Sequence, residues 1–202
     1  MKRTALMPVL ALGLALWQAM PAAAQPAAVG YAQRYAALCA ACHGANGRSE
    51  LPGTPHLAGQ PSFYAITQLF LFREGRRENA AMTAVAKTLT DDDLRGFSEL
   101  IARLPPVAPG TAAAPVDAAR MLQGQALAQR HLCANCHGAD FSGGEQVARL
   151  AGQREEYLAL TLREFKSGQR IGYTNAMNEA VGGIAPGALD TLAYYLARLP
   201  AR

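Results

Sequence analysis

Apolar residues recur every three or four positions along several stretches of the chain, which is the spacing of an amphipathic α-helix. One stretch follows Ser62, which we expect to cap the helix, and ends at Gly75, a residue type at which helices stop. Its apolar positions are Phe63, Ile66, Leu69 and Phe70. A matching stretch ends at Gly168 and carries, at the same spacing, Tyr157, Leu158, Thr161, Leu162 and Phe165. No convincing run alternates between apolar and polar positions, so we predict an all-α fold.

Further helices are predicted on either side of these two. Helices over 29–40 and 117–134 lead into two cysteine-containing segments. Thr90 followed by three aspartates is a capping-box pattern with anions at the positive end of the helix dipole, and the helix that it begins reaches Leu104. A counterpart begins at Pro186. The stretch between the first cysteine segment and Pro61 is rich in Gly, Pro and Asn and is predicted to be loop.

The same landmarks occur twice along the chain, in one order. The offsets are 94 residues for C-x-x-C-H (39–43 and 133–137), 93 for Leu-Ala-Gly-Gln (57–60 and 150–153), and 95 both for Met82 and Met177 and for Ala-Arg-Leu-Pro (102–105 and 197–200). Nearly constant offsets indicate a duplicated domain, and the drift of one or two residues indicates small loop insertions.

This repeat divides the chain into two tandem domains, predicted at 25–105 and 117–202. Residues 106–116 form the linker between them, since prolines among small residues cannot hold a helix there. Each half has about 80 residues, which is marginal for a self-sufficient apolar core. A covalently held prosthetic group would supply the missing buried surface.

Residues 1–24 have the pattern of a secretory signal peptide. Lys2 and Arg3 precede a 13-residue apolar run that ends at Trp17, and small residues precede Gln25. The run is too short to span a bilayer, which needs about 20 residues. We therefore expect cleavage after Ala24 and a soluble mature chain in the periplasm.

All four cysteines belong to the two C-x-x-C-H segments, the attachment motif of c-type haem. Two thiols three residues apart can bond to the two vinyl groups of one porphyrin, and the adjacent histidine can bind its iron. Two haem c groups are therefore predicted, one held by Cys39, Cys42 and His43 and the other by Cys133, Cys136 and His137. The alternatives are weaker, because a zinc site needs four ligands in each half and a thioredoxin-like pair needs a β-α-β context.

Met82 and Met177 are the predicted second axial ligands of the irons. They lie 39 and 40 residues after His43 and His137, at matched positions of the repeat. A thioether favours Fe(II) and raises the reduction potential, as suits an electron carrier. Met121, His56 and His131 are spare donors, but none has a counterpart in the other half.

The net charge of the chain argues against a nucleic-acid partner. Without the leader, 17 positive residues stand against 15 negative ones, and the excess of two is split evenly between the halves. No basic stripe exists, so a nucleic-acid partner is not expected.

Taken together, the chain resembles the two-domain dihaem cytochromes c of the cytochrome c4 type. The segment 39–47, both Leu-Ala-Gly-Gln segments, the two methionines and the closing Leu-Pro carry the likeness. The resemblance implies two class-I cytochrome c folds, His/Met ligation and haems that face each other between the domains. It also implies that the carbonyl of Pro55 orients His43. Val147 stands at the approximate equivalent in the second half, so no such bond is carried over to His137.

The second methionine segment also departs from the family pattern. Asn175 to Pro186 is glycine-rich where Thr83 to Leu89 looks more helical.

The function that the resemblance implies is one-electron transfer by a carrier that is not an enzyme. Its redox partners would be a donor such as a quinol-oxidising complex and an acceptor such as a terminal oxidase or another reductase. One alternative is a fixed haem subunit of a dehydrogenase or oxidase complex, which would hold the soluble chain at the membrane through its partners. Another is a dihaem peroxidase, which would need an open iron position and nearby acid–base groups.

Overall fold

A computed structural model describes residues 26–108, 115–172 and 174–200. The predicted leader and the middle of the predicted linker lie outside these residues. In the N-terminal half the helices are α1 (Pro26–Leu38), α2 (Ala40–His43), α3 (Ser62–Arg73), α4 (Ala80–Ala86) and α5 (Asp91–Arg103). In the C-terminal half they are α6 (Ala118–Arg130), α7 (Ala134–His137), α8 (Glu155–Ser167), α9 (Ala176–Gly182), a 3-10 turn (Pro186–Ala188) and α10 (Leu189–Ala197).

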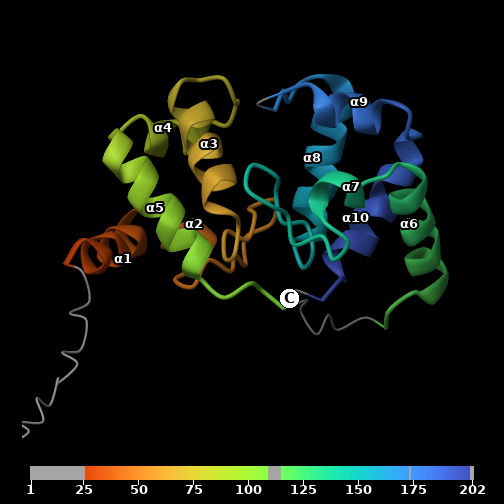
Figure 1. Cartoon of the computed structure of the whole chain (residues 1–202), viewed down its shortest axis with the longest axis horizontal. Helices are drawn as coiled ribbons and strands as arrows, with labels where there is room; N and C mark the ends of the chain where they lie inside the picture. The colour runs from red at the N-terminus through yellow and green to blue at the C-terminus, as the bar shows by residue number, and fades with distance from the viewer. Residues whose placement is uncertain (1–25, 109–114, 173, 201–202) are drawn as a thin grey trace, which may run out of the picture.

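The two halves stand side by side, each built from its own five α-helices (Figure 1). Within the described residues the only β-type pairing is an isolated bridge between Gly144 and Val147, so the predicted all-α class is confirmed. No helix in this part of the chain is long and apolar enough to cross a membrane.

Each half has a separate apolar core. In the first half, α5 packs on α1 and α3. The buried residues of that cluster are Tyr35, Ala65, Leu89, Leu94, Phe97 and Ile101. In the second half, α10 packs on α6 and α8, around a larger cluster that includes Leu158, Leu162, Leu192 and Leu196.

Glycine allows the terminal helices of each half to approach closely. A Cβ at Gly96 would lie 2.2 Å from the Tyr31 ring, and one at Gly124 would lie 2.3 Å from the Tyr195 Cβ. A side chain at Gly124 would also meet the Thr191 backbone oxygen at 2.9 Å and would push α6 away from α10, whereas one at Gly96 would displace the Tyr31 ring from α5.

Helix ends follow the sequence signals at most positions. The capping box is present, since the Thr90 hydroxyl accepts from the Asp93 N–H at 3.2 Å and the Asp93 carboxylate accepts from the Thr90 N–H at 3.0 Å. Gly168 ends α8 in the left-handed conformation, with φ of 77°. Ser62, however, is not a cap: it is the first residue of α3, and Pro61 holds the capping position without a side-chain bond.

Two other expectations about helices are wrong. The helices before the cysteines are not continuous, because a turn separates α1 from α2 and α6 from α7. In the second half this turn places Leu132 at φ of 53°, a left-handed conformation that is rare outside glycine. The glycine-rich second methionine segment does form a helix, α9, which like α4 has seven residues.

Asp93 should make the stability of the first half sensitive to acid. The Arg34 guanidinium pairs with this buried carboxylate and, together with the bonds from Thr90 and against the effect of burial, holds its pKa well below the usual range. A carboxyl with a depressed folded-state pKa stabilises the fold above its unfolded pKa of about 3.9, and this stabilisation is lost as the pH falls below that value. We expect Asp93→Asn to be less stable than wild type at pH 7 but to lose less stability on going to pH 2.5.

The measurement is guanidinium unfolding of both holoproteins at pH 7 and pH 2.5, followed by circular dichroism. Equal losses in the two proteins would contradict the role given to Asp93. The Asp92→Asn variant is a matched control, because its side chain pairs with Arg95 at the surface, where an ion pair contributes about 0 to 1 kcal/mol.

Candidate haem sites

The histidine of each C-x-x-C-H segment is buried at the end of a short helix. His43 closes α2 with 6% of its surface exposed, and His137 closes α7 with 7%. The Nδ1 of His43 lies 3.0 Å from the Pro55 carbonyl oxygen, and the Nδ1 of His137 lies 2.8 Å from that of Ala148. Because a carbonyl can only accept, Nδ1 carries the hydrogen in both rings and Nε2 presents its lone pair.

The hydrogen bond of His43 to Pro55 agrees with the family resemblance. The resemblance carried no such bond over to His137, but the structure shows one. Its acceptor is Ala148, one residue beyond Val147, and it stands 93 residues after Pro55, the same offset as the Leu-Ala-Gly-Gln segments. A carbonyl has no side-chain signature, so proline is not needed for this bond.

Both imidazoles suit a metal ligand. Burial lowers the pKa of His43 and of His137, and the carbonyl bonds offset this only in part. The rings are therefore neutral at pH 7, as a ligand must be. A hydrogen bond at Nδ1 also fixes the tautomer and the orientation of a metal-binding histidine.

The four cysteines share this helical turn with the histidines, and none is paired in a disulfide. Cys42 and Cys136 are exposed, whereas Cys39 and Cys133 are half-buried. Burial raises the pKa of the Cys39 thiol to about 11, against a lowering effect of Arg34, and burial raises that of Cys133 as well. Activated redox thiols have lowered pKa values, so Cys39 and Cys133 lack this feature of a thioredoxin pair. The arrangement fits a porphyrin edge laid along one helical turn, beside a histidine with Nε2 available.

Met82 and Met177 lie on the matching helices α4 and α9, and both are half-buried. These helices pack against the middle helices α3 and α8. Asn79 caps α4 by accepting from the Met82 N–H at 3.0 Å. Next to Met177, the Asn178 amide donates to the Phe165 carbonyl at 2.7 Å, which ties α9 to the end of α8. Each methionine is thus held on a short element that is anchored at its own half's middle helix.

The spare histidines have other surroundings. His56 lies between the two halves, where its Nδ1 accepts from the Ser49 N–H at 3.0 Å. Burial, Arg154 and Arg48 together lower its pKa to about 4. His131 is the C-cap residue of α6. Within the described residues, no three His, Cys, Asp or Glu side chains gather into a group that could hold a metal ion.

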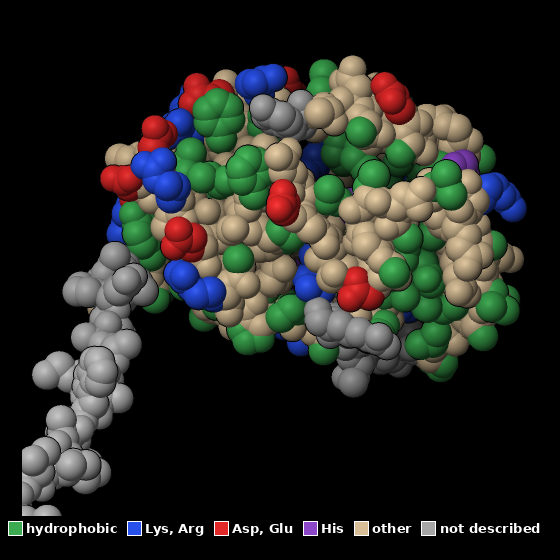
Figure 2. Space-filling view, in the orientation of Figure 1, with side chains coloured by type: hydrophobic (Ala, Val, Ile, Leu, Met, Phe, Trp, Pro, Cys, Tyr) green, Lys and Arg blue, Asp and Glu red, His purple; other side chains and the backbone are tan. Residues whose placement is uncertain are grey.

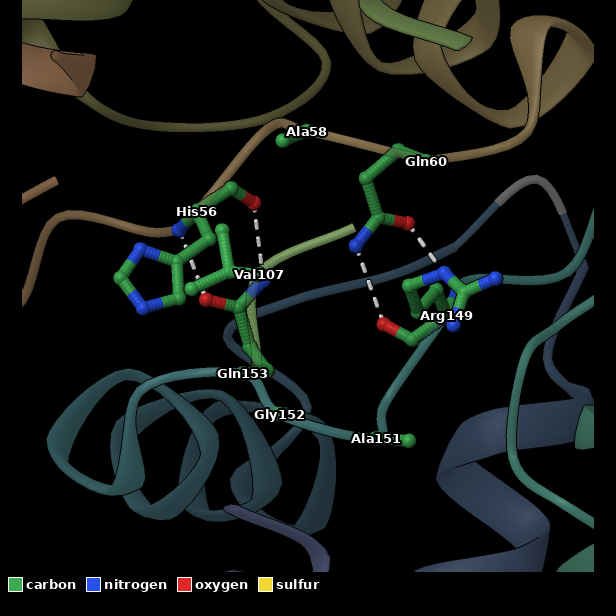
Figure 3. Close-up of a pocket in the computed structure, with 8 residues that line it drawn as sticks. All are labelled: His56, Ala58, Gln60, Val107, Arg149, Ala151, Gly152 and Gln153. Atoms are coloured by element: carbon green, nitrogen blue, oxygen red, sulfur yellow. Dashed lines mark hydrogen bonds between the residues drawn. The ribbon is translucent and has the colours of Figure 1, made fainter. Parts of the chain in front are cut away.

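The interface between the halves uses the Leu-Ala-Gly-Gln segments, which the sequence marks as repeated without revealing their role. Gln153 bonds to the backbone of His56, accepting from its N–H at 2.7 Å and donating to its carbonyl at 2.9 Å. Gln60 makes the same pair of bonds to the backbone of Arg149, both at 3.0 Å (Figure 3). These residues are equivalent in the repeat, so the interface has approximate twofold symmetry.

A second set of contacts joins the loop after each middle helix to the middle helix of the opposite half. Arg77 donates to Tyr157 at 2.9 Å, and Arg170 donates to Tyr64 at 3.4 Å and to Gln68 at 3.3 Å. Burial raises the pKa of Tyr157, but the charges of Arg77 and Arg170 outweigh it and bring that pKa to about 7. The two arginines of this cluster therefore favour the ionised form of the Tyr157 hydroxyl at the interface.

Two C-x-x-C-H turns with buried, oriented histidines in an all-α fold define a c-type cytochrome. The Cytochrome c family model matches residues 28–101. The thiosulfate dehydrogenase electron acceptor of Thiomonas intermedia is 34% identical over 173 residues, covering 81% of this chain and 76% of that protein. Cytochrome c4 of Pseudomonas aeruginosa is 30% identical over 185 residues, covering 86% and 89%. The chain belongs to the dihaem cytochromes c of the cytochrome c4 type.

The solved structures agree with this assignment. Reduced recombinant cytochrome c4 from Pseudomonas stutzeri superimposes with a TM-score of 0.76 at 26% identity, covering 85% of this chain and 98% of that one. The two tandem class-I cytochrome c folds and the two covalently bound haem c groups are thus established for this family member.

Proposed function

We propose that this protein is a periplasmic electron carrier and not an enzyme, with the two domains at 25–105 and 117–202 joined by 106–116. Each haem, when bound, supplies an iron that accepts and gives up one electron. In the first domain the haem is attached by Cys39 and Cys42 and its iron is bound by His43 and Met82. In the second domain the corresponding residues are Cys133, Cys136, His137 and Met177.

The observation that carries this proposal is the repeated histidine geometry. Both imidazoles are buried, neutral and bonded through Nδ1 to a carbonyl, so each would offer the lone pair of Nε2 to an iron. A half-buried methionine on α4 or α9 would supply the second protein ligand of each haem iron when the haem is bound, and this would leave no position for a substrate. This arrangement supports electron transfer over catalysis, which needs an open position.

The donor and acceptor are proposed from the chemistry and from the relatives. A relative that is named as the electron acceptor of a thiosulfate dehydrogenase supports a dehydrogenase as donor, beside a quinol-oxidising complex. The acceptor is a terminal oxidase or another reductase. The second candidate function is that of a fixed haem subunit in a dehydrogenase or oxidase complex. The same relative favours this candidate, because an acceptor that serves one dehydrogenase can stay bound to that enzyme.

The test uses the purified holoprotein. We expect it to take up two electrons per chain and to return both to a purified terminal oxidase in repeated turnovers. Hydrogen peroxide consumption by the reduced protein alone would contradict the carrier function. Co-purification of a stoichiometric partner at high dilution would favour the fixed subunit.

Electron exchange with partners should depend only weakly on salt. Ion pairs neutralise much of the surface charge, as Arg73 does with Glu74 at 3.0 Å and with Asp91 at 2.8 Å. Arg163 pairs with Asp190, and Figure 2 shows blue and red side chains interspersed on the face in view. Such pairs cancel beyond the Debye length, about 8 Å at physiological ionic strength.

We expect the second-order rate of electron transfer to change less than about tenfold between low and high ionic strength. Stopped-flow mixing with a purified acceptor measures this rate. A hundredfold fall would show strong charge steering and would overturn the expectation.

A further inference from the structure

The glutamines of the interface bond to the peptide groups that hold the proximal histidines. The Pro55 carbonyl, which accepts from His43, and the His56 N–H, which donates to Gln153, belong to one peptide unit. A continuous chain therefore runs from the Gln153 amide oxygen through this peptide to the His43 ring. Its two hydrogen bonds are 2.7 Å and 3.0 Å long, and it begins in the opposite half of the molecule.

The same chain exists in the other direction. The Ala148 carbonyl accepts from His137 at 2.8 Å, and the N–H of the same peptide unit, on Arg149, donates to the Gln60 amide oxygen at 3.0 Å. Both glutamines are buried, with 6% and 5% of their surfaces exposed. Both are also held by a return bond from the amide nitrogen to the backbone carbonyl of the same residue (Figure 3).

Hydrogen bonds in such a chain strengthen one another. An amide whose N–H donates to a strong acceptor carries more negative charge on its carbonyl oxygen, by a cooperative effect of perhaps 10–30% per bond. A stronger acceptor at Nδ1–H makes the imidazole a more basic ligand. A more basic ligand stabilises Fe(III) and lowers the reduction potential of the iron that it binds.

We propose that Gln153 and Gln60 are positioning residues that act across the interface, Gln153 on the iron of the first half and Gln60 on the iron of the second half. This inference rests on the proposed ligation by His43 and His137. Each potential is thereby set in part by the other domain, through contacts that exist only while the halves are docked.

The test compares Gln153→Met with Gln60→Met in the full holoprotein. Methionine keeps the length of the side chain and removes both hydrogen bonds to the opposite half. In Gln153→Met it also removes the bond that the Gln153 amide oxygen accepts from the Arg154 N–H at 3.0 Å. Gln153→Met should weaken the hydrogen bond from His43 to the Pro55 carbonyl by the cooperative fraction of about 10–30%. At a fixed solution potential, the reduced-to-oxidised ratio of the first haem should then rise about two- to fourfold. This corresponds to about 18 to 35 mV, at 59 mV per tenfold for a one-electron couple. Gln60→Met should do the same for the second haem.

Haem-specific potentials come from the haem methyl NMR resonances followed through a redox titration. In the reduced, diamagnetic protein, the Nδ1–H resonance of His43 should move upfield in Gln153→Met, and that of His137 in Gln60→Met. Tyr157→Phe is the matched control, because it removes the interface bond from Arg77 and a bond from Arg170 within the second half without touching either peptide unit. It should move neither Nδ1–H resonance.

The crossed pattern decides the outcome. The inference would be overturned if only the haem in the same half as the substituted glutamine changed its potential, or if both haems changed equally. Nδ1–H resonances that did not move would overturn it as well. The methionine–iron absorbance, recorded on the same samples, separates this failure from failure of the proposed ligation. If that band were absent from the wild-type protein, the ligand set itself would be wrong.

Discussion

Replacing Met82 by alanine is expected to abolish the methionine–iron absorbance of one haem and to leave that of the other intact. Met82 lies on α4, at the position that Met177 occupies on α9 in the repeat. Without the thioether, which stabilises Fe(II), the first iron opens and its potential falls by on the order of 0.1 V, within the roughly 0.8 V that axial ligands span. A spectroelectrochemical titration records both effects.

Met121→Ala is the matched control for this experiment. Met121 lies on α6 and has no counterpart in the first half, so its loss should leave both the absorbance and the potentials unchanged. If Met82→Ala retained the full absorbance of two haems, the assignment of Met82 would be wrong. Met177→Ala should mirror the result at the second haem.

Replacing Cys39 and Cys42 together by alanine should leave the first half loosely folded. Within the described residues, the contiguous buried cluster of the first half has six members, against 13 in that of the second half, so we expect the first half to depend more on the haem for buried surface. Fully burying one large apolar side chain contributes only about 1.5–3 kcal/mol, and an 80-residue unit buries few of them. Limited proteolysis with mass spectrometry should find early cleavage in the first half and a protected second half.

The reciprocal variant, with alanine at Cys133 and Cys136, controls for the general effect of losing a haem. We expect it to be cleaved more slowly than the first variant, because the second half retains its larger core. A first half that resisted protease without its haem would refute the structural role given to the cofactor.

Local signals in the sequence predicted much of the fold. The capping box at Thr90, the left-handed stop at Gly168 and the helical spacing of the core positions each depend on neighbouring residues only. The failures have a different origin. The position of Ser62 inside α3 and the turn at Leu132 are set by the direction in which the chain enters or leaves a packed helix. The helix α9 forms in a glycine-rich segment because it packs against α8.

Some residues of the candidate site could be predicted from the sequence, and others could not. Side-chain chemistry marks the cysteines, histidines and methionines, so their residue types and spacing suffice to propose them. The Ala148 carbonyl leaves no trace in the sequence, since every residue has one. Gln60 and Gln153 stand out only as repeated letters, and their bonds to the opposite half appear once the halves are docked.

The approximate twofold symmetry of the glutamine contacts has an evolutionary consequence. An interface in which equivalent residues make the same contacts with the opposite half is the kind that joins two identical subunits. A single-domain ancestor could form it as a homodimer, and duplication with fusion would retain it within one chain. Fusion then frees the two copies to differ, as His56 and Arg149 already do at equivalent positions. A homodimer has to tune both of its redox centres with the same mutation, whereas the fused chain can tune each one separately.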